Sequence, residues 1–345
     1  MRIAHLILSS RFAGSERHAL ELAALQAAAG HEVRLVMRRK AARDSPDAIA
    51  HRVDPAVAVE LVDDWLFRWP ARRQATAFVR GWRPDVAHAH LGSACRSLHP
   101  LAGHCLRVAT LHIEYKPRQH AALDGLVAIA PWQLDAIPAA LRANSVQIDN
   151  WTRPSAPMPD ARAQLRAAHG IAPDAFVFGA LGRVEDSKGL DVLVEAFRRA
   201  DLPGARLVIV GAGKAFERIR AQAGEAVVMP GFTTRARDWM EVFDVFVSAA
   251  RYEPFGLVFL EAMSAGLPVI ASASQGGRYL APVFGREPVP VDDPDALAAA
   301  LREGFQRREP RRTYPMARFD PQARAADVEA FYRQGLARLG RYNAA

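Results

Sequence analysis

The sequence contains very little cysteine and no long hydrophobic run. Its 345 residues include only Cys95 and Cys105, which excludes a disulfide scaffold and any metal-binding cysteine spacing. No segment approaches the run of about 20 apolar residues that a transmembrane helix needs, and the opening stretch MRIAHLILSS has no signal-peptide cleavage site. We therefore expect a protein of a reducing compartment, either free in the cytoplasm or peripheral on the inner face of the cytoplasmic membrane.

Lysine is also scarce, although the chain is basic. The 45 Lys and Arg residues outnumber the 37 Asp and Glu residues, but the only lysines are Lys40, Lys116, Lys188 and Lys214. A basic protein suits anionic substrates or an anionic membrane surface. Nucleic acid is not expected as a partner, because there is no recognised binding motif or sustained basic stripe.

Short apolar runs alternate with longer amphipathic ones, the pattern of βα units around a parallel sheet. The strands are expected at 3–8, 32–37, 85–90, 107–113, 123–130 and 145–149, and then at 175–182, 205–213, 226–231, 244–249 and 267–272. A helix is predicted over 15–30, with Ser15 as its N-cap and Gly30 as its stop. This is an α/β fold.

The chain is long enough for about two domains of roughly 100–200 residues each. The stretch 151–160, with three prolines in WTRPSAPMPD, is interpreted as a linker. The predicted domains are 1–152 and 160–320, and a C-terminal helical segment, 321–345, can return to the first domain. Doubly wound domains bind ligands where loops leave the carboxyl ends of their strands, so a cleft between two such domains is the expected active site.

Two loops of the second half carry cationic or glycine-rich patterns. In GALGRVEDSKGL, Arg183 and Lys188 lie between Gly182 and a helix, which suits a diphosphate; the alternative is a solvated loop with a turn glycine. In VIVGAGK, Gly211 and Gly213 follow a strand and allow close approach of the backbone to a ligand, although a tight βα turn explains them equally well.

A third pattern is RYEPFGLVFLEAMSAG, residues 251–266, which places two glutamates eight residues apart. Pro254 and Gly256 disfavour helix around Glu253, whereas LVFLEAMSA is typical of a helix that ends at Gly266. The unpaired N–H groups at the start of this helix attract a phosphate. Glu261, among apolar neighbours, needs donors such as the hydroxyls of a ribose; a structural glutamate is the alternative.

These patterns together resemble the GT-B retaining glycosyltransferases of family 4, also called group 1. The resemblance rests on the Glu-x7-Glu pattern of Glu253 and Glu261 and on a Gly-Arg-x4-Lys-Gly loop that ends at Gly189. It implies two Rossmann-like doubly wound domains that face a central cleft. It also implies that Glu253 contacts the donor sugar and Glu261 the ribose. Arg183 and Lys188 are implied to bind the donor diphosphate, with the backbone of Phe255, Gly256 and Leu257 facing the phosphates. Gly182 and Gly213 are further implied donor-binding residues.

The N-terminal half resembles the family less closely. Gly14 stands in Ala-Gly-Ser-Glu-Arg, where the family often has two glycines after the first strand, and it still allows close approach of the backbone to the donor or the acceptor. His112 in Thr-Leu-His matches a family histidine that contacts the donor sugar, and we assign it, with Glu253, to catalysis. His90 also resembles a common family histidine. His88 and His90 share one strand face, but no third ligand is evident, so no metal site is predicted.

There are also departures from the family. The usual Gly-Gly-x-x-Glu is Gly276-Gly277-Arg278-Tyr279-Leu280, and no Asp-x-Asp metal motif is present; Asp293 is read instead as a helix N-cap. The segment DDWLFRWPARRQ, 63–74, mixes aromatic and basic residues in a way that suits an anionic lipid surface, although a loop with inward-packed aromatics is as good an explanation.

The resemblance therefore implies a retaining glycosyltransferase, which we expect to need no metal and no cofactor. It would move a sugar from a nucleoside diphosphate sugar to a glycan or glycolipid hydroxyl, in lipopolysaccharide, glycolipid or polysaccharide biosynthesis. A non-catalytic nucleotide-sugar-binding subunit of the same fold is the alternative. A sugar phosphorylase fits less well, because its cofactor needs a lysine near the C-terminus and none follows Lys214.

Overall fold

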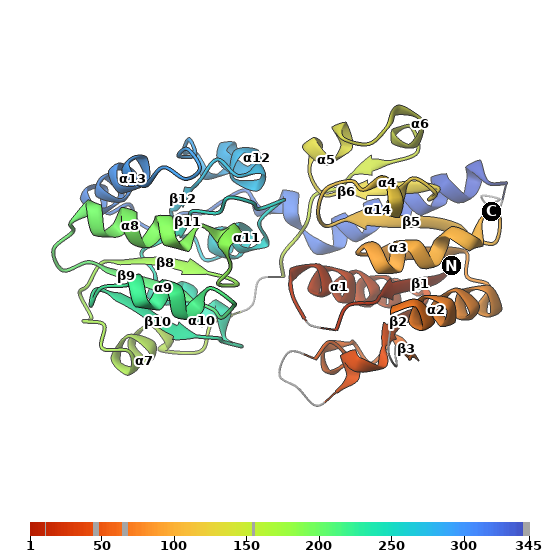
Figure 1. Ribbon diagram of the computed structural model, residues 1–345, viewed down its shortest axis with the longest axis horizontal. Helices are drawn as coiled ribbons and strands as arrows, with labels where there is room; N and C mark the ends of the chain where they lie inside the picture. Colours follow the sequence, from red (N-terminus) through yellow and green to blue (C-terminus); the bar gives the residue numbers. More distant parts are fainter. Residues whose placement is uncertain (11, 44–47, 64–67, 154–155, 341–345) are drawn as a thin grey trace. The chain divides into compact units, whose positions relative to one another are not determined.

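The computed structural model describes residues 1–10, 12–43, 48–63, 68–153 and 156–340, with only the backbone described at 68 and 69. The chain divides into two units, each built on one parallel β-sheet (Figure 1). The first unit comprises Met1–Trp151 and the C-terminal segment that begins at Phe319, and the second comprises Thr152–Arg318. The final helix is therefore part of the first unit.

The sheet of the first unit has the strand order β3-β2-β1-β4-β5-β6-β7. Its strands are β1 (Arg2–Ile7), β2 (Glu32–Arg38), β3 (Ala58–Val62), β4 (Val86–His90), β5 (Leu106–Leu111), β6 (Gly125–Ala128) and β7 (Val146–Gln147). All but β3 overlap predicted strands. β3 is an edge strand in which only Val62 is fully buried, so its sequence has no marked apolar run. The order reverses between β1 and β4, where a doubly wound sheet opens toward ligands.

Helices cover both faces of this sheet (Figure 1). α1 (Gly14–Ala28) and α14 (Pro321–Arg338) share a core with one face, in which Tyr332 packs with Ile3 and Val108. α2 (Arg68–Trp82) and α3 (Gly92–Leu98) cover the other face. The shorter helices are α4 (Pro117–His120), α5 (Pro131–Asp135) and α6 (Ala139–Arg142).

The start of α1 differs from the prediction. Ser15 is not the N-cap: Ala13 occupies that position with extended backbone, and no side chain caps the helix. Ser15 lies inside the first turn, where its hydroxyl donates to the Glu16 carboxylate over 2.9 Å. The helix stops as predicted, since Gly30 has a φ of +83° just beyond its end.

The expected linker also begins later than predicted. Trp151 is only 2% exposed and belongs to the core of the first unit. Its indole packs against His18 at a tilt, with the ring centres 4.1 Å apart, and its Nε1 donates to Glu21 over 2.9 Å. Burial of a large aromatic ring makes this residue an anchor at the end of the unit rather than part of a flexible connection.

The sheet of the second unit has the order β10-β9-β8-β11-β12. Its strands, all predicted, are β8 (Val177–Leu181), β9 (Arg206–Val210), β10 (Val227–Gly231), β11 (Val245–Ser248) and β12 (Val269–Ala271). The helices are α7 (Ala161–Ala168), α8 (Leu190–Ala200), α9 (Phe216–Gln222), α10 (Ala236–Val242), α11 (Leu257–Ser264), α12 (Gln275–Phe284) and α13 (Pro294–Arg307). The predicted cap of α13 is confirmed, because the Asp293 carboxylate accepts the N–H of Ala296 over 2.9 Å.

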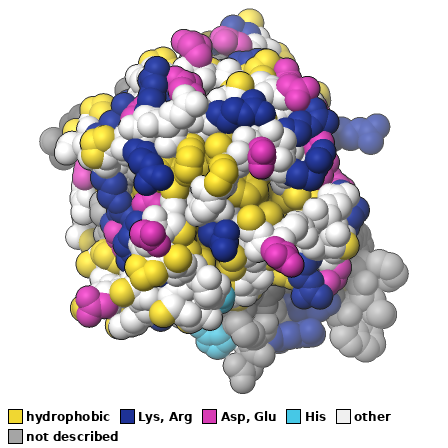
Figure 2. Space-filling model, turned by 90° about the vertical axis from the view of Figure 1, so that its left-hand side faces the viewer, with side chains coloured by type: hydrophobic (Ala, Val, Ile, Leu, Met, Phe, Trp, Pro, Cys, Tyr) yellow, Lys and Arg dark blue, Asp and Glu magenta, His cyan; other side chains and the backbone are white. Residues whose placement is uncertain are grey.

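None of the helices in the described part of the chain has both the length and the apolar surface needed to span a bilayer. Of the aromatic and basic segment 63–74, residues 64–67 and the side chains of 68 and 69 lie outside the described residues. Figure 2 shows a face on which basic and acidic side chains are interspersed around a central apolar area. Charge on this face is therefore not segregated by sign.

Candidate functional site

The predicted donor loops leave neighbouring strands of the second sheet at the point where the strand order reverses. β8 is followed by Gly182 and Arg183, and the 3₁₀ turn η4 (Asp186–Lys188) ends on Lys188. β11, its neighbour in the sheet, is followed by the loop that carries Glu253. Loops diverge at such a reversal and leave room for a ligand at the carboxyl ends of the strands.

Lys188 and Glu253 contact each other directly. The Lys188 Nζ lies 2.5 Å from the Glu253 Oε2, and the two side chains are 24% and 13% exposed. A hydrogen bond between charged groups is among the stronger ones in proteins, so each side chain orients the other. A ligand phosphate at this position would compete with Glu253 for the lysine ammonium.

Arg251 holds these two loops together and was not recognised from the sequence. Its guanidinium donates to both carboxylate oxygens of Asp191, each over 2.8 Å, and to the backbone oxygen of Asp186 over 2.7 Å. It also pairs with Asp292 over 2.6 Å. The hydrogen bonds that Arg251 donates to Asp191 lower the pKa of Asp191 and raise the pKa of Arg251.

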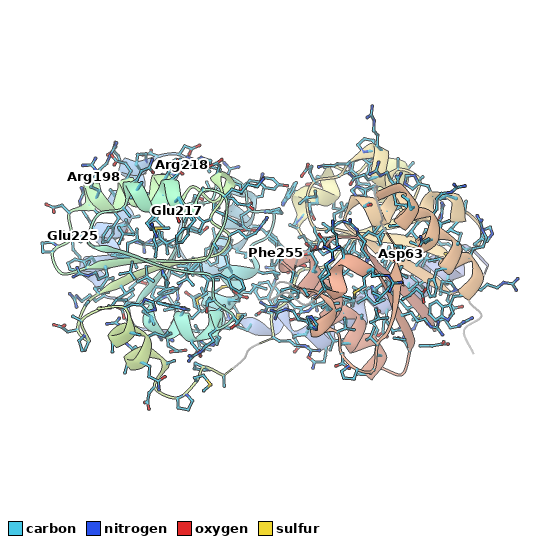
Figure 3. All side chains as sticks on the ribbon, turned by 60° about the horizontal axis from the view of Figure 1, so that its bottom comes forward. Asp63, Arg198, Glu217, Arg218, Glu225 and Phe255 are labelled. Atoms are coloured by element: carbon cyan, nitrogen blue, oxygen red, sulfur yellow. The ribbon has the colours of Figure 1, made fainter. Side chains whose placement is uncertain are left out.

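Backbone contacts reinforce this link. The N–H groups of Arg251 and Tyr252 both donate to the carbonyl of Ser187, over 2.9 and 3.1 Å. On the other side of η4, Arg218 of α9 pairs with the Asp186 carboxylate; Figure 3 labels Arg218. The turn that ends in Lys188 is therefore fixed from two directions.

The two glycines after β9 are required by close backbone packing. A Cβ at Gly211 would lie 1.8 Å from the Gly182 carbonyl oxygen, and one at Gly213 would lie 2.2 Å from that of Val184. Gly211 also has a φ of +143°, which side chains rarely adopt. These contacts explain both glycines as part of the turn that supports the Arg183 loop. They do not test the prediction that Gly213 approaches the donor.

Arg183 is exposed, unlike Lys188 and Glu253. Its side chain is 64% exposed and pairs with Glu185 over 2.9 Å. It nevertheless lines the same hollow as Gly182, Lys188, Glu253 and Val258. A second cation is therefore within the same depression as the Lys188–Glu253 pair.

The N-terminus of α11 adjoins this hollow. The backbone changes direction at Gly256, which has a φ of +92°, and the helix begins at Leu257. Phe255 is buried, at 1% exposure, and anchors the turn (Figure 3). The first N–H groups of a helix have no carbonyl partners within it, so the helix start offers donors to an anion. Glu261 lies one turn further on and is half-buried.

The Gly276-Gly277 pair lies in the first turn of α12 and packs on the Glu253 loop. The Gly276 N–H donates to the backbone oxygen of Glu253 over 2.7 Å, and a Cβ at Gly276 would lie 2.2 Å from the Phe255 carbonyl oxygen. The family glutamate is replaced by Leu280, which is fully buried. The side chain at this position of α12 is therefore part of the hydrophobic core and not a carboxylate of the site.

The histidines predicted in the first unit belong to a buried polar cluster. His90 ends β4, and its Nδ1 lies 3.0 Å from the Nε2 of His112, which follows β5. The other nitrogen of His90 contacts His5 of β1 over 3.1 Å, and His5 contacts Gln26 of α1 over 2.7 Å. Gly14 is exposed and begins α1.

A third histidine does accompany His88 and His90, contrary to the sequence interpretation. One nitrogen from each of His5, His88 and His90 lies within 4.8 Å of the others, close enough to share a metal ion. Every ring nitrogen of these three residues already has a hydrogen-bond partner, however: His88 contacts Tyr332 and also Thr110, the latter over 2.8 Å. A metal would have to replace several of these hydrogen bonds.

Gly14, His90 and His112 thus lie in the first unit, and the other predicted residues lie in the second. Within the second unit, the structure brings together Gly182, Arg183, Lys188 and Glu253. Arg251, Gln26 and His5 were missed, because a lone arginine, glutamine or strand histidine carries no spacing signal.

Two family models match consecutive parts of the chain. The model described as "Glycosyltransferase Family 4" matches residues 12–177, and the one described as "Glycosyl transferases group 1" matches residues 175–306. The chain belongs to glycosyltransferase family 4. The two matches meet at residues 175–177, where β8 of the second unit begins, so each model covers most of one sheet.

Named relatives of this family 4 protein include two bacterial glycosyltransferases. It is 28% identical to the lipopolysaccharide core biosynthesis glycosyltransferase LpsD of Rhizobium meliloti, over 69% of this chain and 68% of that protein. It is 36% identical to the D-inositol 3-phosphate glycosyltransferase of Jonesia denitrificans, over 42% of this chain. That match spans only 39% of the Jonesia protein's length.

The fold of this family 4 protein is GT-B. Anabaena HepE, solved in complex with UDP and glucose, superimposes with a TM-score of 0.75. The superposition covers 99% of this chain and 100% of HepE at 18% identity, so the likeness is one of fold.

Proposed function

We propose that this family 4 glycosyltransferase is a retaining enzyme that moves a sugar from a nucleoside diphosphate sugar to an acceptor hydroxyl. The observation that carries the proposal is the contact of Lys188 with Glu253, in one hollow with Arg183 and beside the start of α11. These groups offer positive charge for a diphosphate and a carboxylate for sugar hydroxyls. The binding of UDP and glucose by HepE supports a nucleotide-sugar donor.

In the proposed reaction, the bond between the anomeric carbon and the diphosphate oxygen breaks, and the acceptor oxygen bonds to the same face of the sugar. The acceptor's hydroxyl proton passes to the leaving diphosphate. Lys188, Arg183 and the N–H groups at the start of α11 stabilise the charge that develops on the diphosphate. Glu253 and His112 hold the sugar hydroxyls, and Glu261 holds the ribose. No metal or other cofactor is required in this scheme.

The first experiment identifies the donor. Thermal-shift measurements with UDP, GDP, ADP and their sugars should reveal one base and one sugar that stabilise the protein most. A ligand at 100 times its dissociation constant adds about 2.7 kcal/mol to the free energy of unfolding. Stabilisation by none of them would contradict the assignment of the site.

The second experiment tests the chemistry. With the donor and an acceptor in hand, proton NMR of the product, with and without EDTA, should show a retained anomeric configuration and unchanged activity. An inverted product, or activity that EDTA abolishes and Mg²⁺ or Mn²⁺ restores, would rule out this mechanism. Nucleotide-sugar binding without any transfer would favour the non-catalytic subunit.

The proposed acceptor is a glycan or glycolipid of lipopolysaccharide-type biosynthesis, in keeping with the name of the relative LpsD. The proposed site of action is the cytoplasm or the inner face of the cytoplasmic membrane, with segment 63–74 as the contact to anionic lipid. Flotation with anionic and neutral vesicles tests this part. Equal recovery with both kinds of vesicle would remove the membrane contact from the proposal.

A further inference from the structure

A continuous chain of hydrogen bonds leads from the interior of the first unit to His112. The Gln26 Oε1 lies 2.7 Å from the His5 Nε2, the His5 Nδ1 lies 3.1 Å from the His90 Nε2, and the His90 Nδ1 lies 3.0 Å from the His112 Nε2. Gln26, His5 and His90 have no exposed surface. The four side chains come from α1, β1, β4 and the end of β5, so only the fold aligns them.

The imidazoles of this chain are uncharged at neutral pH. Burial lowers the pKa of His5 to about 4 and that of His112 to about 3. Burial, followed by the neighbouring His88, lowers the pKa of His90 well below its usual value. A neutral imidazole has a single N–H, so a ring that donates from one nitrogen must accept at the other.

The direction of the whole chain is therefore set at one end. The amide oxygen of Gln26 can only accept, which requires the His5 N–H on Nε2. His5 then accepts at Nδ1 from His90, and His90 accepts at Nδ1 from the Nε2–H of His112. The reverse amide orientation would turn every hydrogen bond around and leave the proton of His112 on Nδ1.

We propose that Gln26 is a positioning residue that fixes, through His5 and His90, the tautomer of His112, so that His112 meets a hydroxyl of the substrate as a hydrogen-bond acceptor. The role in substrate binding rests on the proposed function; the control of the tautomer does not. The Nδ1 of His112 has no hydrogen-bond partner among the described residues, and the side chain is only half-buried. A bare nitrogen lone pair suits a sugar hydroxyl and disfavours a phosphate or a carboxylate.

The packing around His112 also limits its motion. His18, which is 4% exposed, meets the His112 ring edge-on with the ring centres 5.1 Å apart. The His18 ring in turn packs against Trp151, with the ring centres 4.1 Å apart. A ring flip of His112 would break its hydrogen bond to His90, so orientation and tautomer are fixed together.

The tautomer can be read directly by long-range proton–nitrogen NMR of protein labelled with ¹⁵N-histidine. His112→Gln identifies the signals of His112 by their loss. In the unsubstituted protein, we expect the His112 proton on Nε2 and a bare Nδ1. The opposite assignment would overturn the proposal without any need for a substituted protein.

Substitution at Gln26 tests where the control lies. Gln26→Glu keeps an acceptor toward His5 and should keep the His112 tautomer. Gln26→Met removes the acceptor at similar volume and should give a substantial population of His112 protonated on Nδ1. Thr110→Val, the matched control, removes the hydrogen bond to His88 in the same core but outside the chain, and should leave His112 unchanged. If Gln26→Met protein folds and keeps the original His112 tautomer, then Gln26 does not control this tautomer through His5 and His90, and the proposal is refuted.

Kinetic measurements distinguish the control of the His112 tautomer, which we call the relay, from the proposed function. Once a donor is known, Gln26→Met should lower kcat/KM by about threefold to tenfold, the effect of one lost hydrogen bond. The Gln26→Glu variant should retain most of the kcat/KM of the unsubstituted protein. An altered tautomer with unchanged kcat/KM would refute the contact with substrate. An absence of transfer by the unsubstituted protein, with the expected NMR pattern, would refute the proposed function and uphold the relay.

Discussion

Acidification should destabilise the first unit strongly, because its core buries neutral histidines. The pKa of His5 is lowered to about 4 and that of His112 to about 3 by burial, compared with about 6.5 in an unfolded chain. Below pH 6.5 the unfolded state therefore binds protons that the folded state does not. The stabilisation is complete above pH 6.5 and is lost as the pH falls toward 4 and 3.

The magnitude follows from these pKa values. Between pH 8 and pH 5, His5 alone should remove about 2 kcal/mol from the free energy of unfolding. His112, which is half-buried, should remove a similar or smaller amount, so the two together cost about 3–4 kcal/mol. The lowered pKa values of His18, His88 and His90 act in the same direction. Domains are stable by only about 5–15 kcal/mol, so the loss is a large fraction of the total.

The assay is urea unfolding followed by circular dichroism at half-unit steps from pH 8 to pH 4.5. The free energy of unfolding should fall with a slope that rises from about 2 kcal/mol per pH unit at pH 6 to about 2.5 kcal/mol per pH unit at pH 5, because His5 and His112 together take up nearly two protons on unfolding. His5→Asn should reduce the slope by about one proton. Thr110→Val should lower stability at every pH without changing the slope. A free energy of unfolding that stays level between pH 7 and pH 5 would refute the argument.

Further predictions concern the second unit. Glu261→Ala should weaken nucleotide binding about 10- to 150-fold in calorimetry, the effect of a lost charged hydrogen bond. Glu253→Ala should leave the affinity for free nucleotide unchanged and lower turnover. Normal affinity and turnover in both variants would contradict the site. Gly211→Ala should prevent stable folding of the unit or greatly lower its Tm, because the Cβ would lie 1.8 Å from a carbonyl oxygen; an unchanged Tm would show that the turn is looser than described. Arg251→Gln should weaken donor binding about tenfold through loss of the bidentate contact to Asp191, whereas Arg198→Gln, on an exposed helix surface, should not; equal affinities for the two variants would remove Arg251 from the support of the site.

Local patterns in the sequence were sufficient for most elements and for the positions of the loops that carry Lys188 and Glu253. Each strand of the second sheet is a continuous apolar run, and the Lys188 and Glu253 loops follow directly from where two of those runs end. The N-cap at Asp293 and the helix end at Gly266 depend on interactions within a few residues, so they could be predicted. Ser15 shows the limit of this reasoning, since the helix begins at Gly14 after Ala13, which has no side chain that could cap it.

Only the tertiary structure decided which distant side chains meet. Lys188 and Glu253 are 65 positions apart, and His5 and His90 are 85 apart; each pair meets because the strand order reverses between the strands that carry them. The same reversal brings His5 to His88 and His90. Arg251 and Gln26 belong to no recognisable motif in the sequence. The fold places Arg251 against Asp191 and Gln26 against His5, and these buried or half-buried groups need a hydrogen-bond partner. Trp151 was placed in the linker because of the prolines that follow it, yet it is buried, since the first unit offers its indole both a ring surface at His18 and an acceptor at Glu21.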